Sequence, residues 1–108
     1  MDNDNILTNI LFELRRGVVI LAVLSQLDEE QYGYSLLTRL SEQGLTVDQG
    51  TLYPLLRRLE TQGLLESKWR IEDPRPRRYY VLSKLGVKVL PLIKAEWSKL
   101  SALVEGII

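Results

Sequence analysis

The stretch Gln49-Gly-Thr-Leu-Tyr-Pro-Leu-Leu-Arg-Arg-Leu-Glu-Thr-Gln-Gly-Leu-Leu-Glu-Ser-Lys-Trp-Arg-Ile71 decides the fold, because the period of its sequence pattern changes partway along. The first part predicts a helix that ends at Gly63, with its inner face formed by Leu52, Leu55, Leu56 and Leu59. From Leu65 to Ile71, Leu65, Ser67, Trp69 and Ile71 alternate with charged residues, which is strand spacing. The stretch therefore predicts a helix followed by a strand.

Two more helices are expected before this stretch. Apolar residues recur at helical spacing from about Asn5 to Leu27 and again, over a shorter distance, from about Tyr32 to Gln43. The third helix begins near Asp48, an acceptable N-cap, while Thr46 with Gln49 forms a competing capping box. The second and third helices, joined by a short turn, form a helix-turn-helix pair.

A hairpin and a last helix follow. We expect residues 72–76 to be irregular, because this segment contains two prolines, and a second strand to run from Arg77 to Leu82. Ser83 then caps a helix that continues toward the C-terminus. The predicted fold is mainly α with a small antiparallel β-hairpin. It is a winged helix-turn-helix domain over residues 1–83, followed by a C-terminal dimerisation helix over residues 84–108.

Composition excludes several classes of function. The 108 residues, enough for one domain, contain no cysteine and no histidine, so thiolate or imidazole metal sites and imidazole-based catalysis are absent. The sequence has no glycine-rich phosphate loop, and we expect neither an enzyme nor a cofactor or metal site. Fourteen basic residues balance fourteen acidic ones, which argues mildly against nucleic-acid binding unless positive charge is clustered locally.

Such a cluster lies in the hairpin. Five cations fall within it: Lys68, Arg70, Arg75, Arg77 and Arg78. They can neutralise phosphates, although a solvated charged surface is the common alternative for a cluster of this kind. In a winged helix-turn-helix protein the second helix of the pair enters the major groove. Its outer face here would present Gln49, Thr51, Tyr53, Pro54 and Arg57 to DNA.

Several motifs resemble the PadR family of bacterial transcriptional regulators. They are Glu13-Leu-Arg-Arg-Gly17, Tyr32-Gly-Tyr34, the Gly50–Glu60 block, Gly63–Ser67 with Trp69, and Pro76-Arg-Arg-Tyr-Tyr80 followed by Leu82-Ser-Lys-Leu-Gly86. The resemblance implies a homodimeric repressor of palindromic double-stranded DNA operators, similar to a short subgroup that includes multidrug-responsive members. It also implies DNA contacts from Tyr34, Thr51, Tyr53, Pro54 and Arg57, and from Arg77 and Arg78 in the hairpin. Asp48-Gln49 departs from the frequent Ser-Glu at the helix start, which leaves the operator sequence open.

The last helix carries a long apolar stripe that predicts a homodimer. Because the helices and hairpin before it can complete a core, the stripe needs another surface, and the first helix of a second copy is the natural one. The expected interface residues are Leu7, Leu14, Ile93, Trp97, Leu100 and Val104.

Trp97 has two possible roles. It can be a buried anchor of the dimer, or it can stack on a planar aromatic effector in a cleft between the two copies, with Leu14 and Val18 in the cleft wall. The resemblance implies the second role.

Two further expectations concern location and the rival function. The acidic N-terminus does not resemble a signal peptide, and the apolar run Val18–Leu24 is too short to cross a bilayer, so we expect a cytoplasmic protein. The rival interpretation is a winged-helix module that docks protein rather than DNA. Steep salt dependence of binding would favour DNA.

Overall fold

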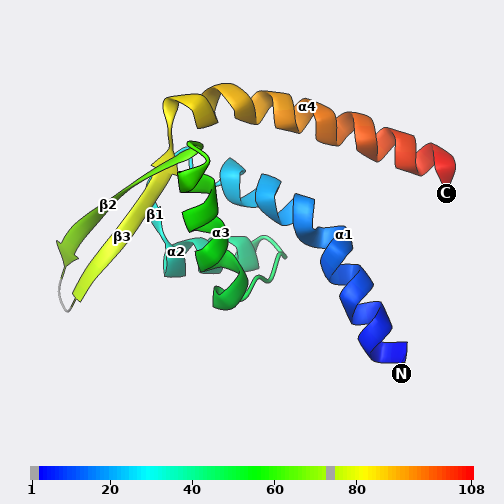
Figure 1. The fold of residues 1–108 in the computed structure, drawn as a ribbon, viewed down its shortest axis with the longest axis horizontal. Coiled ribbons are helices and arrows are strands. Elements are labelled where there is room, and N and C mark those ends of the chain that lie inside the picture. The colour runs from blue at the N-terminus through cyan, green and yellow to red at the C-terminus, as the bar shows by residue number, and fades with distance from the viewer. Residues whose placement is uncertain (1–2, 73–74) are drawn as a thin grey trace.

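The computed structural model describes residues 3–72 and 75–108 and confirms the predicted fold class (Figure 1). Its elements in chain order are α1 (Asn3–Ser25), β1 (Gln31–Tyr32), α2 (Gly33–Glu42), α3 (Gln49–Thr61), β2 (Leu65–Glu72), β3 (Arg75–Leu82) and α4 (Lys84–Ile107). The described helices within residues 3–72 and 75–108 all lack the combination of length and apolar character needed to cross a lipid bilayer.

The core lies where α1, α2 and α3 meet one end of the sheet. The fully or almost fully buried leucines come from all three helices and, at Leu27, from the turn that follows α1: Leu24, Leu27, Leu36, Leu40, Leu52, Leu56 and Leu59. Leu65 and Leu82, paired across β2 and β3, close the sheet side of this core, and Leu90 of α4 joins it. The predicted inner face of α3 is therefore confirmed.

The β2–β3 hairpin, which we call the wing, is longer than the sequence predicted. The expectation that residues 72–76 are irregular is wrong for Glu72, Arg75 and Pro76, which lie in the strands, while residues 73–74 lie outside the described part. Pro76 pairs with Ile71, and β1 reaches β3 only at Tyr79 and Tyr80. Among the described residues, the other edge of β3 therefore has no neighbouring strand at Pro76, and a proline that cannot donate a hydrogen bond is tolerated there.

A third strand, β1, was not predicted. It pairs antiparallel with β3 through Gln31↔Tyr80 and Tyr32↔Tyr79, giving the sheet order β1-β3-β2. A strand of two residues is too short to show an alternating pattern, so the sequence carries no periodic signal for it.

The helix ends follow the predicted signals. Gly63, where the sequence predicts the end of α3, has a φ of +88°, and Gly44 after α2 has a φ of +96°; both values are left-handed, as is usual just after a helix. The Ser83 hydroxyl caps α4 by accepting a hydrogen bond from Gly86 N–H at 3.0 Å. The same hydroxyl donates to the Gly63 carbonyl at 2.6 Å, so it ties the start of α4 to the end of α3.

Figure 1 shows how these elements are arranged around the core. The wing projects from one side of the molecule, while the ends of α1 and α4 extend from the other side and diverge from each other. The helix-turn-helix pair therefore lies between the wing and the free ends of the two long helices.

Candidate nucleic-acid interface

Asp48 determines where α3 begins. Its backbone is extended (φ −85°, ψ 162°), and its Oδ1 accepts a hydrogen bond from Thr51 N–H at 2.7 Å. Of the two caps that the sequence allowed, the structure uses this one. Because the leucine face of α3 is buried, the opposite face, including Gln49, Pro54 and Arg57, is exposed.

A groove of about 770 Å³ lies between α3, the start of α2 and the wing. It contains seven of the nine residues expected to contact DNA: Tyr34, Gln49, Tyr53, Arg57, Arg75, Arg77 and Arg78. The fold therefore brings most of the residues expected to contact DNA together from three separate elements. The prediction from sequence missed Tyr32, Gly33, Trp69 and Tyr80, which also line the groove.

Thr51 and Pro54 lie on the other flank of α3. They line a second groove, of about 590 Å³, whose other side is formed by α1 residues that include Phe12, Arg15 and Val19. Pro54 lies within α3 and is exposed, as is Thr51. The residues of α3 that are expected to contact DNA are thus divided between two grooves, one on each flank of the helix.

Tyr53 is positioned by a glycine. A Cβ atom added to Gly33 would lie 2.3 Å from Cε1 of the Tyr53 ring, far closer than any real contact. The ring therefore packs directly against the backbone at the start of α2, which only glycine permits. The Tyr32-Gly-Tyr34 motif marked this place in the sequence, but its spatial reason is visible only in the fold.

Most of the wing cations already have carboxylate partners. Glu30 pairs with both Lys68 and Arg70, the first at 2.9 Å. Glu72 pairs with Arg77 at 3.4 Å, and Glu60 with Arg78 at 2.7 Å. By contrast, within residues 3–72 and 75–108 neither Arg57 nor Arg75 has a carboxylate within ion-pairing distance. The wing therefore offers less unpaired positive charge than its composition suggests.

Aromatic rings hold the guanidinium groups in place. Arg77 lies over the Tyr32 ring at 4.4 Å from its centroid, and Arg70 lies over the Tyr79 ring at 4.6 Å. Tyr32 and Tyr79 meet edge to face at 5.4 Å. Such cation–π contacts reduce the mobility of arginine side chains, so these cations have defined positions before any ligand arrives.

Three pKa shifts follow from the same contacts. Hydrogen bonding to Lys68 is the main cause that lowers the pKa of Glu30, with the nearby charge of Arg70 acting in the same direction. The Tyr79 hydroxyl donates to Glu72 at 2.8 Å, and this bond raises its pKa. Burial raises the pKa of Tyr80. Both tyrosine hydroxyls therefore stay protonated at neutral pH, and Glu30 stays charged.

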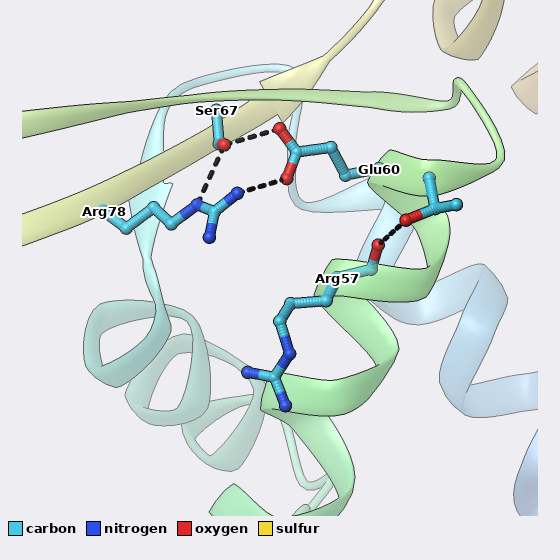
Figure 2. Close-up of polar contacts among 5 residues, drawn as sticks. Arg57, Glu60, Ser67 and Arg78 are labelled. Atoms are coloured by element: carbon cyan, nitrogen blue, oxygen red, sulfur yellow. Dashed lines mark hydrogen bonds and ion pairs between the residues drawn. The ribbon is translucent and has the colours of Figure 1, made fainter.

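Figure 2 shows that two arginines at this site have different surroundings. The Arg78 guanidinium lies against Glu60 and Ser67, whereas the Arg57 side chain extends from α3 away from that cluster. Among the described residues, Arg57 thus presents a cation without a carboxylate partner on the exposed side of α3, whereas Arg78 is half-buried and bound by Glu60 and Ser67.

The residues expected to bind an effector or a second copy lie on α1 and α4. Leu14 is 71% exposed and Trp97 is 47% exposed, and Val18 is also at the surface. The two grooves described above do not include them. Among the expected dimer residues Leu7, Leu100 and Val104 are exposed, while Ile93 packs partly against the core of its own chain.

Comparisons with known proteins match the chain to transcriptional regulators. A profile of the transcriptional regulator PadR-like family matches residues 20–91. The transcriptional regulator Rv3488 of Mycobacterium tuberculosis is 44% identical over 75 residues, which cover 68% of this chain and 70% of that protein.

Solved structures agree over nearly the whole chain. A PadR family transcriptional regulator from Eggerthella lenta superposes with a TM-score of 0.87 at 43% identity, covering 96% of this chain and 93% of that one. A PadR-like transcription factor from Bacteroides fragilis gives 0.77 at 33% identity, covering 93% of this chain and 99% of that one. The chain therefore belongs to the PadR-like family of transcriptional regulators, and this membership implies DNA binding.

Proposed function

We propose that the chain is a cytoplasmic, homodimeric repressor that binds a palindromic DNA operator, with α3 in the major groove and the wing along the phosphate backbone. One observation carries the proposal: a single groove joins Gln49, Tyr53 and Arg57 of α3 to the three arginines of β3, Arg75, Arg77 and Arg78. Side chains that read base edges and side chains that hold phosphates are both needed for specific binding.

The proposal assigns different tasks to these residues. Gln49 lies at the start of α3, where side chains of a recognition helix meet base edges, and its amide can both donate and accept. Tyr53 and Arg57 lie one helical turn apart on the same flank, and Arg57 has no carboxylate partner among the described residues. Arg75 and Arg77 near the wing tip would contact phosphates, as would Tyr34 at the start of α2.

The test is titration of the purified protein with the DNA that lies upstream of its own gene. We expect tight binding that resists random-sequence competitor and weakens by about a thousandfold between about 50 and 200 mM salt, as for about six neutralised phosphates. Tyr53→Ala and Arg57→Ala should each abolish the preference for this DNA.

A protein-docking module is the second candidate, and one observation favours it. The wing exposes Trp69 (65%) and Ile71 (93%), and three glutamates neutralise most of the wing cations. In that case the titration would show only weak DNA binding, unchanged by Tyr53→Ala or Arg57→Ala.

The proposed dimer would cover the apolar faces that one chain leaves in water. These exposed apolar residues lie on α1 and α4 and include Leu7, Ile10, Leu14, Trp97, Leu100, Val104 and Ile107. Exposed apolar surface of this extent is typical of an interface. A two-fold dimer would also supply two copies of α3 for the two halves of a palindrome.

We further propose that a planar aromatic effector binds between the two copies against Trp97, with Leu14 and Val18 in the wall, and releases the operator. The effector must bind the conformation that cannot bind DNA more tightly than the conformation that can, because otherwise it does not shift the equilibrium between the two. The chain has two tryptophans, so Trp69→Phe leaves Trp97 as the single reporter. Adding acridine as a probe should quench its fluorescence and weaken operator binding. Unchanged operator affinity at saturating acridine would contradict release by this compound.

A further inference from the structure

One carboxylate connects the recognition helix to both strands of the wing. Glu60, in the last turn of α3, accepts a hydrogen bond from Ser67 Oγ of β2 at 2.5 Å on Oε2. Its Oε1 accepts from Arg78 Nη2 of β3 at 2.7 Å. Arg78 Nε also donates to Ser67 Oγ at 3.0 Å, so the three side chains form a closed ring of hydrogen bonds (Figure 2).

The surroundings strengthen this cluster. The side chains of Arg78 and Glu60 are only 35% and 26% exposed, so water screens their attraction less than at an open surface. Arg78 also lies 5.4 Å from the Tyr80 ring centroid and 5.8 Å from that of Trp69. Hydrogen bonds between charged partners are about twice as strong as neutral ones, so the ring is well suited to hold a fixed geometry.

Glu60 has a connection that the other glutamates of the region lack. Glu72 pairs within the wing, and Glu30 joins the wing to the segment before β1. Among the ion pairs in residues 3–72 and 75–108, Glu60–Arg78 alone links α3 to the wing. Beyond it the wing extends into solvent, as the 93% exposure of Ile71 shows.

We propose that Glu60 is a positioning residue for DNA binding: together with Ser67 and Arg78 it holds the wing at a fixed distance from the Arg57 face of α3. The inference rests on the proposed function. It gives Arg78 a different task from the phosphate contact that the sequence suggested. The two tasks predict opposite changes in operator affinity when the Glu60 charge is removed. If Arg78 binds phosphate, its release from Glu60 would raise the affinity. If Arg78 positions the wing, the loss of its partner would lower the affinity.

The experiment compares Glu60→Gln with the wild type for binding to the operator and to random-sequence DNA over a series of salt concentrations. We expect operator affinity to fall about tenfold, the effect of losing one charge-assisted interaction of about 1.4 kcal/mol, while random-sequence affinity falls little. The control is Glu66→Gln, which removes the same charge from an exposed position on β2 and should leave the ratio of the two affinities unchanged. Operator binding by Glu60→Gln that is as tight as wild type, or tighter with a steeper salt dependence, would overturn the proposal.

A second measurement needs no DNA. Amide hydrogen exchange of residues 68–71 and of Arg77 and Arg78 should be faster in Glu60→Gln than in wild type, while exchange in the buried half of α3 stays slow. Unchanged exchange in the wing would refute the positioning role even if the protein binds its operator. Conversely, a wild type that binds no DNA specifically would refute the proposed function and leave this result intact. If Glu60→Gln does not fold, Ser67→Ala removes only the bridging hydroxyl. Unchanged operator affinity or unchanged amide exchange in the wing of this variant would then refute the positioning role.

Discussion

Tyr53 reaches the groove because the residue beneath its ring is a glycine. The ring lies so close to Gly33 that a methyl group there would overlap Cε1 at 2.3 Å and Cζ at 2.8 Å. The obstruction is a side chain rather than backbone, so a larger residue at position 33 would displace the phenol without breaking the fold. If Tyr53 contacts DNA as proposed, we expect Gly33 to affect DNA binding through the orientation of the Tyr53 ring.

Gly33→Ala should weaken operator binding about tenfold, which corresponds to one lost contact of about 1.4 kcal/mol. Its effect on the free energy of unfolding should stay near 1 kcal/mol, measured by thermal or urea unfolding. In a Tyr53→Ala background, where no ring remains to be displaced, Gly33→Ala should have no further effect on affinity. Equal losses in the two backgrounds would show that Gly33 acts in some other way.

At the scale of single residues, the sequence identified the types of side chain at the site but not their partners. Gln49, Tyr53 and Arg57 follow from helical spacing, because residues three or four apart share a face whatever the tertiary structure. Glu30 with Arg70, and Glu60 with Arg78, are 40 and 18 residues apart. No local pattern links such positions, so the neutralisation of the wing cations could not be predicted.

Among the elements, the wing is attached to the rest of the domain partly by Glu30. This carboxylate pairs with Lys68 and Arg70 of β2, which lowers its pKa. A carboxyl whose pKa is lower in the folded state stabilises the fold above its ordinary pKa, and this contribution disappears as the pH falls through the lowered value.

Glu30→Gln should therefore lower Tm at neutral pH, and its difference from wild type should shrink as the pH falls below about 4. The measurement is thermal unfolding at low salt over this range. Glu29→Gln, an exposed neighbour, is the matched control and should give no pH-dependent difference. A Tm difference between Glu30→Gln and wild type that is the same at every pH would contradict this account.

The helix α4 is anchored at Gly86. A Cβ atom there would lie 2.2 Å from the Leu64 carbonyl oxygen, and backbone cannot move aside as a side chain can. We expect Gly86→Ala to reduce the free energy of unfolding by about 1–3 kcal/mol, the usual range for overpacking. In Gly106→Ala, in the same helix, the new methyl meets nothing within 4 Å, and stability should be unchanged or slightly higher. Equal effects of the two variants, measured by urea unfolding, would argue against close packing at Gly86.

The elements themselves were largely predictable, and the exceptions have physical reasons. Four helices and two strands carry apolar spacing over several turns or several residue pairs, which is the signal that secondary structure leaves in a sequence. The two-residue β1 has no room for such a signal. The prediction at residues 72–76 was wrong at Glu72, Arg75 and Pro76, because proline excludes a strand only where a neighbour needs its N–H.

For the whole molecule, the proposed dimer can be tested at the exposed apolar residues of α4. Leu100 lies at the middle of the exposed apolar stripe of α4. Leu100→Glu should therefore prevent dimerisation, and the protein should sediment as a monomer of 12.4 kDa instead of a dimer of twice that mass. Ser98→Glu adds the same charge on another face of the helix and should leave the mass unchanged. If analytical ultracentrifugation gave 12.4 kDa for the wild type as well, the proposed dimer would be wrong.

The most direct test of the whole account is a hydroxyl-radical footprint of the protein on its upstream DNA. If two copies of α3 occupy successive major grooves, the footprint will show two protected regions with centres about 34 Å apart, and both will disappear in Arg57→Ala. A single protected region, or two regions that Arg57→Ala leaves unchanged, would contradict the assignment of α3 as the element that reads DNA.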